Sequence, residues 1–394
     1  MTKSLLTAIG LVLFTGIISA QRNITDSILF QGYQRLYITH LPAGYTGNDS
    51  VPAVFVLHGG GGTAKGMISF TEFDLVSDTA GFIAVFPQGA VPASTGGYTW
   101  ADGRGTPADS AGIDDVAFIS ALTDQLINDY RINRSKIYTC GMSNGGFMSQ
   151  RLAVELNARI AAVASVGSTI DSSQVSVYQP PAPMPVMLIN GDSDPFVPFN
   201  GGPIKGGQGY AISSFDLFNF WVLKNNCSGP ADSVQLPDIV TTESSTITKY
   251  YNDHCDCNSE VVLYKVIGGG HTWPGVPGFL YELIAGQTNE DIHASVEIWL
   301  FFKKFVNSGT TGISSYTSPF RIYPNPADGF INIEFSDASG NALKLADATG
   351  KILIQKTNLY SDVTVDLSGL RTGIYFLILQ SGKKYYSARI IKNN

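Results

Sequence analysis

Ser143 stands at the centre of a Gly-x-Ser-x-Gly pentapeptide that runs from Gly141 to Gly145. A serine at a sharp turn between a strand and a helix is a nucleophile in many hydrolases, and flanking glycines let other backbone pack closely there. By itself the pentapeptide is weak evidence, because a chain this rich in Gly and Ser forms it by chance on the order of 0.3 times. An apolar run before it and a helical pattern after it support Ser143 as a covalent nucleophile.

A serine nucleophile needs a histidine base, and that base needs a carboxylate to orient it. Three histidines follow Ser143 in the sequence. His271 comes after an apolar run and three glycines, where a late loop can swing back over the serine. His254 lies among cysteines, and His293 lies in a helical pattern. We therefore expect His271 to be the base.

Two carboxylates compete for the role of the orienting acid. The apolar run at residues 186–189 leads into a loop that contains Asp192 and Asp194. An Asp side chain in a turn often accepts hydrogen bonds from nearby backbone, which is the role expected of Asp192. Asp194 lies further into the loop, and we expect it to orient His271.

Acyl transfer also requires backbone N–H donors for the developing oxyanion. One expected donor is Asn144, the residue after the nucleophile. The other is expected in the glycine run after His58, with Gly60 as the first choice and Gly61 as the second. The same run lacks the Gly-Lys-Ser/Thr ending of a phosphate-binding loop.

Aromatic residues near these motifs are candidates for substrate binding. Trp273 comes two residues after the expected base, and Tyr98 and Trp100 lie in a glycine-rich stretch. Exposed rings at these positions would stack on an aromatic ring, a sugar or a polyester. Packing in the core is the alternative for each of them, and it is the favoured interpretation for Trp221.

The elements that must position these residues alternate between short apolar runs and helical patterns. The runs end at Gly or Pro and show little alternation of polar and apolar residues, which predicts an α/β fold with a mostly parallel sheet covered by helices. The expected strands are residues 51–57, 81–86, 136–140, 160–166, 186–189 and 261–267. The expected helices are residues 113–130, 144–156, 213–224 and 291–305.

The start of the chain has the features of a secretory signal peptide. Lys3 precedes an apolar run from Leu5 to Ile18, and small residues lead up to Ala20. A membrane anchor is the weaker alternative, because the run is short for a span, and we expect no span in the mature protein. Residues 21–306 then form the expected catalytic domain.

Export permits disulfide bonds. Of the four cysteines, Cys140 lies in an apolar run and is expected to be a buried thiol. We expect one bridge from Cys227, to Cys255 or to Cys257. A zinc site at Cys255 and Cys257 is the weaker alternative, because the sequence lacks a second pair of ligands at suitable spacing.

Charged residues are only 14% of the chain and hydrophobic residues 44%, which indicates a globular protein with a substantial core. The net charge of −7 leaves no basic face for nucleic acid. A polar linker is expected at residues 307–319. Residues 320–394 contain short strands at tight intervals, which predict a small all-β sandwich. These strands are expected at residues 330–335, 342–345, 352–355, 363–367 and 374–379.

Five motifs between residues 30 and 306 occur in the order found in the feruloyl esterase and poly(3-hydroxybutyrate) depolymerase branch of carbohydrate esterase family 1, which the chain resembles. They are Leu57–Ala64, Asp114–Phe118, Gly141–Gly146, Gly191–Asp194 with Val197-Pro198, and Gly268–Gly275. The resemblance implies an α/β-hydrolase fold, a Ser143–His271–Asp194 triad, and no metal or organic cofactor. It also implies a disulfide before the histidine strand, for which the spacing favours Cys227–Cys255.

Two positions depart from the family pattern. The family often has His-Gly-Thr where this chain has Asn190-Gly191-Asp192, which places an extra acid near the site. A cysteine that family members often carry in the oxyanion loop is replaced by Gly60.

The end of the chain resembles the C-terminal sorting domain of the type IX secretion system. The similarity lies in Tyr323–Ala327, Asp347–Lys351 and the ending from Gly373 to Lys392. It implies a Bacteroidetes-type source, export across the outer membrane by the type IX machinery, and removal of the tail or anchoring through it. A substrate-binding sandwich is the alternative.

Together these features predict a serine carboxylic-ester hydrolase that is secreted or held at the cell surface. Feruloylated plant polysaccharide is the leading expected substrate, and polyester and acetylated xylan are the alternatives. Two weaker hypotheses assign the chain to other functional classes, as a peptidase or as a non-catalytic binding protein.

Overall fold

The computed structural model describes residues 22–94, 96–307, 320–325, 327–335, 341–347, 351–359, 362–381 and 384–393. The chain divides into two compact units between Gly309 and Thr310. The expected signal peptide and residues 308–319 of the expected linker lie outside the described residues.

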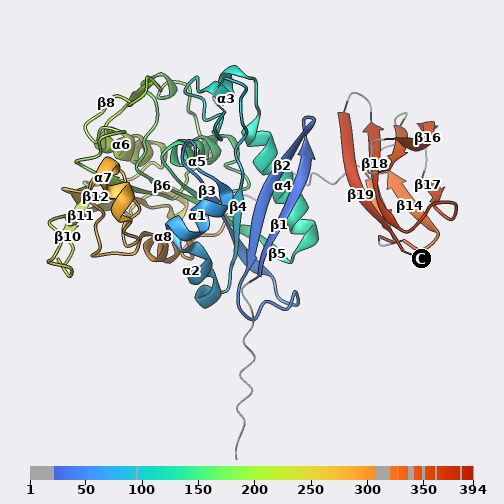
Figure 1. The fold of residues 1–394 in the computed structure, drawn as a ribbon, viewed down its shortest axis with the longest axis horizontal. Coiled ribbons are helices and arrows are strands. Elements are labelled where there is room, and N and C mark those ends of the chain that lie inside the picture. Colours follow the sequence, from blue (N-terminus) through green and yellow to red (C-terminus); the bar gives the residue numbers. More distant parts are fainter. Residues whose placement is uncertain are drawn as a thin grey trace, which may run out of the picture. The chain divides into compact units, whose positions relative to one another are not determined.

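Six parallel strands form the centre of the first unit (Figure 1). Their spatial order is β4, β3, β5, β6, β7, β12. They are β3 (Val51–Leu57), β4 (Ile83–Pro87), β5 (Ile132–Met142), β6 (Ala162–Val166), β7 (Val186–Gly191) and β12 (Val261–Ile267). Their side chains are buried along almost their whole length, because helices cover both faces of the sheet. The predicted mostly parallel α/β sheet is confirmed.

Two hydrophobic cores lie on opposite faces of this sheet. One includes Leu122, Leu152 and Trp221 from three helices, and the other includes Met67 and Ile298 from two more. Burial of each large apolar side chain contributes roughly 1.5–3 kcal/mol. The helices are α1 (Ala64–Thr71), α2 (Phe73–Ala80), α3 (Pro107–Ser110), α4 (Asp115–Asp129), α5 (Asn144–Glu155), α6 (Ser214–Lys224), α7 (Phe279–Ala285) and α8 (Ala294–Phe302).

Antiparallel strands extend the sheet at both edges, and the sequence patterns did not predict them. They are β1 (Arg22–Phe30) and β2 (Tyr33–Leu41) beside β4, and β11 (Thr246–Asn252) and β10 (Asp232–Gln235) beside β12. Gln31 and Gly32 both have positive φ, as a two-residue hairpin loop requires. Every residue of β10 is exposed, so this strand lacks the apolar signal of the central ones. A separate two-stranded ladder joins β8 (Gly202–Pro203) and β9 (Tyr210–Ala211).

The carboxyl ends of the parallel strands meet along one edge of the sheet. Strands β3, β5, β7 and β12 end there at Leu57, Met142, Gly191 and Ile267. Four of the five motifs singled out in the sequence begin at or directly after these ends, and the fifth, Asp114–Phe118, forms the start of α4. Because loops at the carboxyl ends of parallel strands form the binding crevice of such sheets, the fold brings the candidate residues to one place.

The second unit consists of two antiparallel sheets around a core of its own. Ile331, Leu345 and Leu377 are among the side chains that are fully buried in this core. The strands are β13 (Phe320–Tyr323), β14 (Phe330–Phe335) and β17 (Val363–Asp366) in one sheet, and β16 (Ile352–Leu359), β15 (Asn341–Ala346), β18 (Gly373–Ser381) and β19 (Lys384–Lys392) in the other. The predicted small all-β fold is confirmed. Within the described parts of both units, the helices are too short or too polar to cross a membrane.

Candidate active site

Ser143 occupies a strained turn between β5 and α5. Its backbone has φ 54° and ψ −122°, and its N–H donates to the carbonyl of Val166 at 2.9 Å. A non-glycine residue with positive φ costs on the order of 1–3 kcal/mol, so the surrounding structure must hold it in place. A Cβ on Gly141 would lie 2.4 Å from the Gly145 carbonyl carbon, and one on Gly145 would lie 2.3 Å from the Leu57 carbonyl oxygen. Both flanking positions of the pentapeptide therefore require glycine.

His271 and Asp194 are in direct contact. His271 Nδ1 lies 2.6 Å from Asp194 Oδ2, and the two side chains are only 5% and 2% exposed. The other carboxylate oxygen of Asp194 accepts the backbone N–H groups of Phe196 and Val197 at 2.7 and 2.8 Å. These bonds fix the carboxylate, and the contact at Nδ1 leaves Nε2 as the imidazole nitrogen that can exchange a proton with a serine hydroxyl.

The imidazole of His271 lies against the end of β6, the parallel neighbour of β5. A Cβ on Gly167, the residue after β6, would lie 3.0 Å from His271 Nδ1 and 3.1 Å from Met142 Cε. The backbone N–H of His271 donates to the carbonyl of Ala285 at 2.6 Å. The loop after β12 thus carries the histidine to the same strand ends as the Ser143 turn.

Asp192 has a different set of partners. Its Oδ1 accepts the N–H of Gly268 at 2.7 Å, and its Oδ2 lies 3.4 Å from Lys265 Nζ. Asp192 therefore stabilises the turn that precedes His271, whereas the contact with the imidazole belongs to Asp194.

The glycine run after β3 lies beside the Ser143 turn. A Cβ on Gly59 would lie 3.4 Å from Ser143 Cβ, and one on Gly60 would lie 3.9 Å from Asn144 Cβ. The N–H of Gly61 donates to the carbonyl of Tyr98 at 2.7 Å, so that donor is already used. Asn144 is the first residue of α5, where backbone N–H groups have no partner within the helix.

His58 fixes the start of this run. Its Nε2 accepts hydrogen bonds from the Gly89 N–H at 2.9 Å and the Gln88 amide at 2.8 Å, so Nδ1 carries the proton and donates to the Gly59 carbonyl. Burial lowers the pKa of His58 to about 4. The imidazole is therefore neutral at neutral pH and acts as a structural support for the run.

The chain is similar to known esterases. Residues 35–200 match the model described as "Esterase PHB depolymerase". A protein named NocK from Nocardia uniformis subsp. tsuyamanensis is 30% identical over 274 residues, which cover 67% of this chain and 78% of that protein. The chain belongs to the PHB depolymerase esterase family. It is a serine-type carboxylic-ester hydrolase.

Other relatives of the esterase carry feruloyl or acetylxylan esterase names. Feruloyl esterase B of Piromyces equi is 28% identical over 60% of this chain, which spans only 42% of that longer relative. Feruloyl esterase C of Emericella nidulans is 27% identical over 60% of this chain and 76% of its own. An acetyl xylan esterase structure from Aspergillus awamori covers 64% of this chain and 94% of its own, with 15% identity and a TM-score of 0.43.

The tail of the esterase matches a second family. Residues 321–393 match the "Secretion system C-terminal sorting domain". The expected export is confirmed: this tail directs the esterase to the cell surface or beyond it.

The expected exposure of two tryptophans is wrong. Trp100 and Trp273 are both 0% exposed. Trp100 Nε1 donates to the His58 carbonyl at 2.8 Å, and Trp273 Nε1 donates to Ser295 Oγ at 3.1 Å. The ring of Trp100 packs against His58 and is closed off from a substrate, whereas Trp273, although buried, lines a cavity beside α1. Tyr98 is partly exposed.

Trp221 is buried in the core of the esterase, as the favoured interpretation predicted, and its Nε1 donates to Gln150 Oε1 at 2.7 Å. Patterns of residue type do not separate such buried tryptophans from exposed ones, because burial depends on loops that come from elsewhere in the chain.

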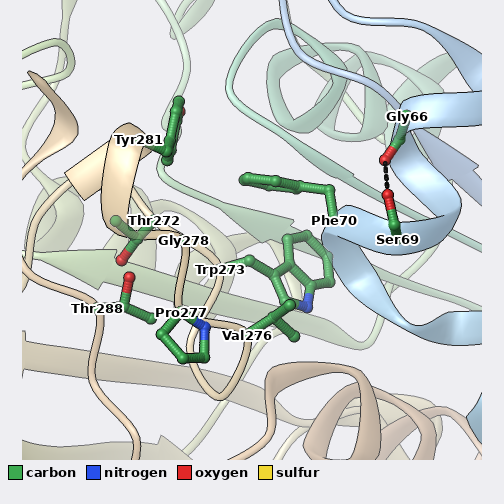
Figure 2. Close-up of a pocket in the computed structure, with 10 residues that line it drawn as sticks. All are labelled: Gly66, Ser69, Phe70, Thr272, Trp273, Val276, Pro277, Gly278, Tyr281 and Thr288. Carbon is green, nitrogen blue, oxygen red and sulfur yellow. Dashed lines mark hydrogen bonds between the residues drawn. The ribbon is translucent and has the colours of Figure 1, made fainter. Parts of the chain in front are cut away.

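A cavity of about 230 Å³ lies between α1 and the segment after His271 (Figure 2). Phe70 and Tyr281 meet edge to face in it, with ring centroids 5.4 Å apart. Burial, with a smaller contribution from the charge of Asp194, raises the pKa of Tyr281 to about 12. Thr272 and Trp273, which directly follow His271 in the chain, line the cavity, so it lies beside the His271–Asp194 pair. Its lining is Gly66, Ser69, Phe70, Thr272, Trp273, Val276, Pro277, Gly278, Tyr281 and Thr288.

The four cysteines of the esterase differ in their state. Cys227 and Cys255 form a disulfide, Cys257 is an exposed free thiol, and Cys140 is a buried one. Burial raises the pKa of the Cys140 thiol well above its usual range, so it is inert as a nucleophile.

The two remaining candidate histidines have other partners. His254 is exposed, and its Nε2 lies 3.7 Å from Asp253. His293 Nε2 lies 3.1 Å from Glu72 Oε2.

The sequence patterns missed two buried ion pairs near the glycine run, Arg35–Asp115 and Arg104–Asp102. The positions of the charged residues in the sequence give a signal for these ion pairs. Charged residues are scarce in this chain, and three of these four lie within fifteen positions of Trp100.

Proposed function

We propose that Ser143, His271 and Asp194 form the catalytic triad of this esterase. The observation that supports it is the 2.6 Å contact between His271 Nδ1 and Asp194 Oδ2, placed over the strand ends where the strained Ser143 turn begins. The backbone N–H groups of Asn144 and Gly60 are the proposed oxyanion donors. Gly60 is preferred to Gly61 because the N–H of Gly61 is bonded to Tyr98.

In the proposed cycle, His271 Nε2 takes the Ser143 proton while Ser143 Oγ attacks the ester carbonyl carbon. The carbonyl oxygen becomes an oxyanion held by the two N–H groups. The C–O bond to the alcohol then breaks, and the alcohol leaves with the proton from His271. A water molecule attacks the acyl-enzyme by the same route, which releases the acid and restores Ser143.

A labelling experiment tests the nucleophile. A fluorophosphonate probe should modify the wild-type protein at a single serine, and peptide mapping should place the adduct on Ser143. The Ser143→Ala variant should fold normally, resist the probe and lose p-nitrophenyl acetate hydrolysis by several orders of magnitude. Retention of activity by that variant would remove Ser143 from its proposed role.

The leading substrate proposal is a feruloylated plant polysaccharide. Two observations support it. Relatives covering 60% of the chain are named feruloyl esterases. The cavity beside the acid–base pair is lined by aromatic and apolar side chains, with the hydroxyls of Ser69, Thr272 and Thr288 at its walls, and such a lining suits a phenolic ring.

Polyester hydrolysis is the second candidate. The family description names a polyester depolymerase, and α7 exposes three apolar side chains close to His271 in the sequence. Leu280, Leu283 and Ile284 are 78%, 70% and 62% exposed. They recur at helical spacing, so they share one face of α7.

Parallel product analysis separates these substrates. Methyl ferulate, acetylated xylan and polyhydroxybutyrate films should be incubated with equal amounts of wild-type enzyme and of Ser143→Ala. Release of ferulate at the highest rate supports the leading proposal. If only hydroxybutyrate or acetate is released, the corresponding alternative replaces it.

We also propose that the type IX secretion machinery recognises the tail at residues 320–394 after the signal peptide at residues 1–20 has been removed. The family match of residues 321–393 supports this partner. In a host that has this machinery, deletion of the tail should leave the esterase in the periplasm, and cell fractionation with an activity assay measures its location.

A further inference from the structure

Asp102 and Arg104 form an ion pair that is shielded from solvent. Their side chains are 0% and 1% exposed. Arg104 Nε lies 3.0 Å from both carboxylate oxygens of Asp102, and Arg104 Nη2 lies 2.6 Å from Oδ2. In a chain with few charges, a pair this deeply buried is costly unless its geometry is good and its remaining hydrogen-bonding groups are satisfied.

The carboxylate of this pair also binds Asn144. Asn144 Nδ2 donates to Asp102 Oδ2 at 2.6 Å and to the Trp100 carbonyl at 3.2 Å. Asn144 Oδ1 accepts the Trp100 N–H at 2.8 Å and the Thr99 hydroxyl at 3.0 Å. A carboxamide has two N–H donors and one oxygen with two lone pairs, so the side chain of Asn144 is fully engaged. It cannot rotate without breaking several buried hydrogen bonds.

The guanidinium of Arg104 also contacts α5 and the segment that contains Gln208. It lies 3.6 Å above the ring of Phe147 in α5, and its Nη1 donates to the Gln208 carbonyl at 3.2 Å. Phe147 packs with Val197, whose backbone N–H is bonded to Asp194. Arg104 therefore links the start of α5 with the loop that carries the acid.

The charge balance of the pair also matters at this position. Burial raises the pKa of the Asp102 carboxyl, and the positive charge of Arg104 opposes that rise. A carboxylate without its guanidinium would repel a negative oxygen that develops at the first turn of α5. With Arg104 in place the pair adds no net charge there.

We propose that the Asp102–Arg104 pair is a positioning device for the oxyanion hole: it locks the Asn144 side chain, and thereby the direction of the Asn144 backbone N–H, while it keeps this buried position neutral. Neither residue touches the substrate. The inference rests on the proposed function, in which the Asn144 N–H stabilises the oxyanion.

Two variants test the proposal. Asp102→Asn keeps the side-chain shape but turns an N–H₂ group towards Arg104 or towards Asn144, and Arg104→Lys keeps the charge but loses the forked contact. The kcat of Asp102→Asn should fall on the order of tenfold to a hundredfold, less than the loss of a whole oxyanion donor. The KM for a p-nitrophenyl ester should stay within about twofold, because ground-state binding is untouched.

A second readout distinguishes positioning from a general structural effect. A boronic acid that forms a tetrahedral adduct with Ser143 places an oxygen in the oxyanion hole, so its Ki should rise by the same factor as kcat/KM falls. In Arg104→Lys the rise in Ki and the fall in kcat/KM should again be equal but smaller, about threefold or more. This variant provides the test if Asp102→Asn does not fold. Glu260→Gln is the matched control. It removes the charge from another buried carboxylate, paired with Lys304 at 2.6 Å at the amino end of β12, and it should leave kcat and Ki within about twofold.

Three outcomes overturn the proposal. The first is a folded Asp102→Asn or Arg104→Lys variant whose kcat is unchanged. The second is a rise in KM alone, which would assign the pair to substrate binding. The third is a fall in kcat with an unchanged Ki for the boronic acid. Failure of the proposed function itself is recognised separately, because the fluorophosphonate probe would then leave Ser143 unlabelled in the wild-type protein.

Discussion

Asp194 uses both carboxylate oxygens, one for the imidazole of His271 and one for two backbone N–H groups of its own loop. The second set of bonds prevents the carboxylate from rotating away from the imidazole. Asp192, two residues earlier, is held by Gly268 and Lys265 instead. Two acids so close in sequence therefore have distinct tasks, one at the imidazole and one in the turn that presents it.

Substitution of each acid should separate these tasks. Asp194→Asn is expected to lower kcat by about 10⁴-fold with little change in fold, because an amide no longer holds the histidine tautomer that the reaction needs. Asp192→Asn is the matched control and should lower kcat by less than about tenfold. Steady-state kinetics on p-nitrophenyl acetate measures both, and the proposed roles are exchanged if Asp192→Asn shows the larger loss.

His58 should make stability depend on pH. Its pKa of about 4 in the folded protein is below the ordinary value of 6.5, so the unfolded chain binds the proton more readily. The stabilisation is therefore complete above pH 6.5 and is lost as the pH falls towards 4. Between pH 7 and pH 4.5 this residue alone should lower the free energy of unfolding by about 2–3 kcal/mol.

Urea unfolding of the wild type and of His58→Gln at those two pH values checks the prediction. Glutamine cannot titrate, so the variant should be less stable at pH 7 but should lose less stability on acidification. His254→Gln removes an exposed histidine and should keep the pH dependence of the wild type. Equal pH dependence in wild type and His58→Gln would contradict the assignment.

At the scale of elements, the sequence predicted the six central strands and the helices α4, α5, α6 and α8, but not α1 and α2. The six central strands are continuous apolar runs because both faces of the sheet are covered, and that signal is independent of tertiary detail. The outer strand β10 is mostly polar and exposed, so it resembles a loop until its partner is known. The site residues could be predicted because each motif follows a recognisable strand and the motifs occur in a fixed order along the chain. The burial of Trp100 could not be predicted, because it depends on a contact with His58 from a distant loop.

The disulfide joins the segment after α6 to the segment after β11 and should stabilise the catalytic unit. Cys227 follows α6, Cys255 follows β11, and 28 positions separate them. A bridge that closes a loop of this length restricts the unfolded chain and contributes roughly 3–4 kcal/mol. The Cys227→Ala/Cys255→Ala variant should lose that amount in urea unfolding and keep its kcat, since the bridge is away from the active-site residues.

Cys257→Ser is the control for the disulfide variant. Its thiol is exposed and outside the bridge, so stability should change by less than about 0.5 kcal/mol. A large loss in this variant would show that Cys227 pairs with Cys257 instead.

At the scale of the whole molecule, each unit has the parts it needs to fold alone. The catalytic unit has a core on each face of its sheet, and the tail has a separate core that includes Ile331 and Leu377. The two family matches, residues 35–200 and 321–393, do not overlap. This organisation suits a tail that serves export and a catalytic unit that works after the tail has been removed.

A chain that begins at Gln21 and ends at Gly309 should therefore be a complete esterase. Its kcat/KM on p-nitrophenyl acetate should lie within about twofold of the full-length value, because no residue of the proposed triad or oxyanion hole lies beyond His271. Calorimetry of the full-length protein should show two unfolding transitions, and the shortened chain should retain only one of them. A loss of more than about tenfold in kcat/KM, with the remaining transition shifted to lower temperature, would mean that the tail supports the catalytic unit. In that case the boundary near residue 309 would not separate independent domains.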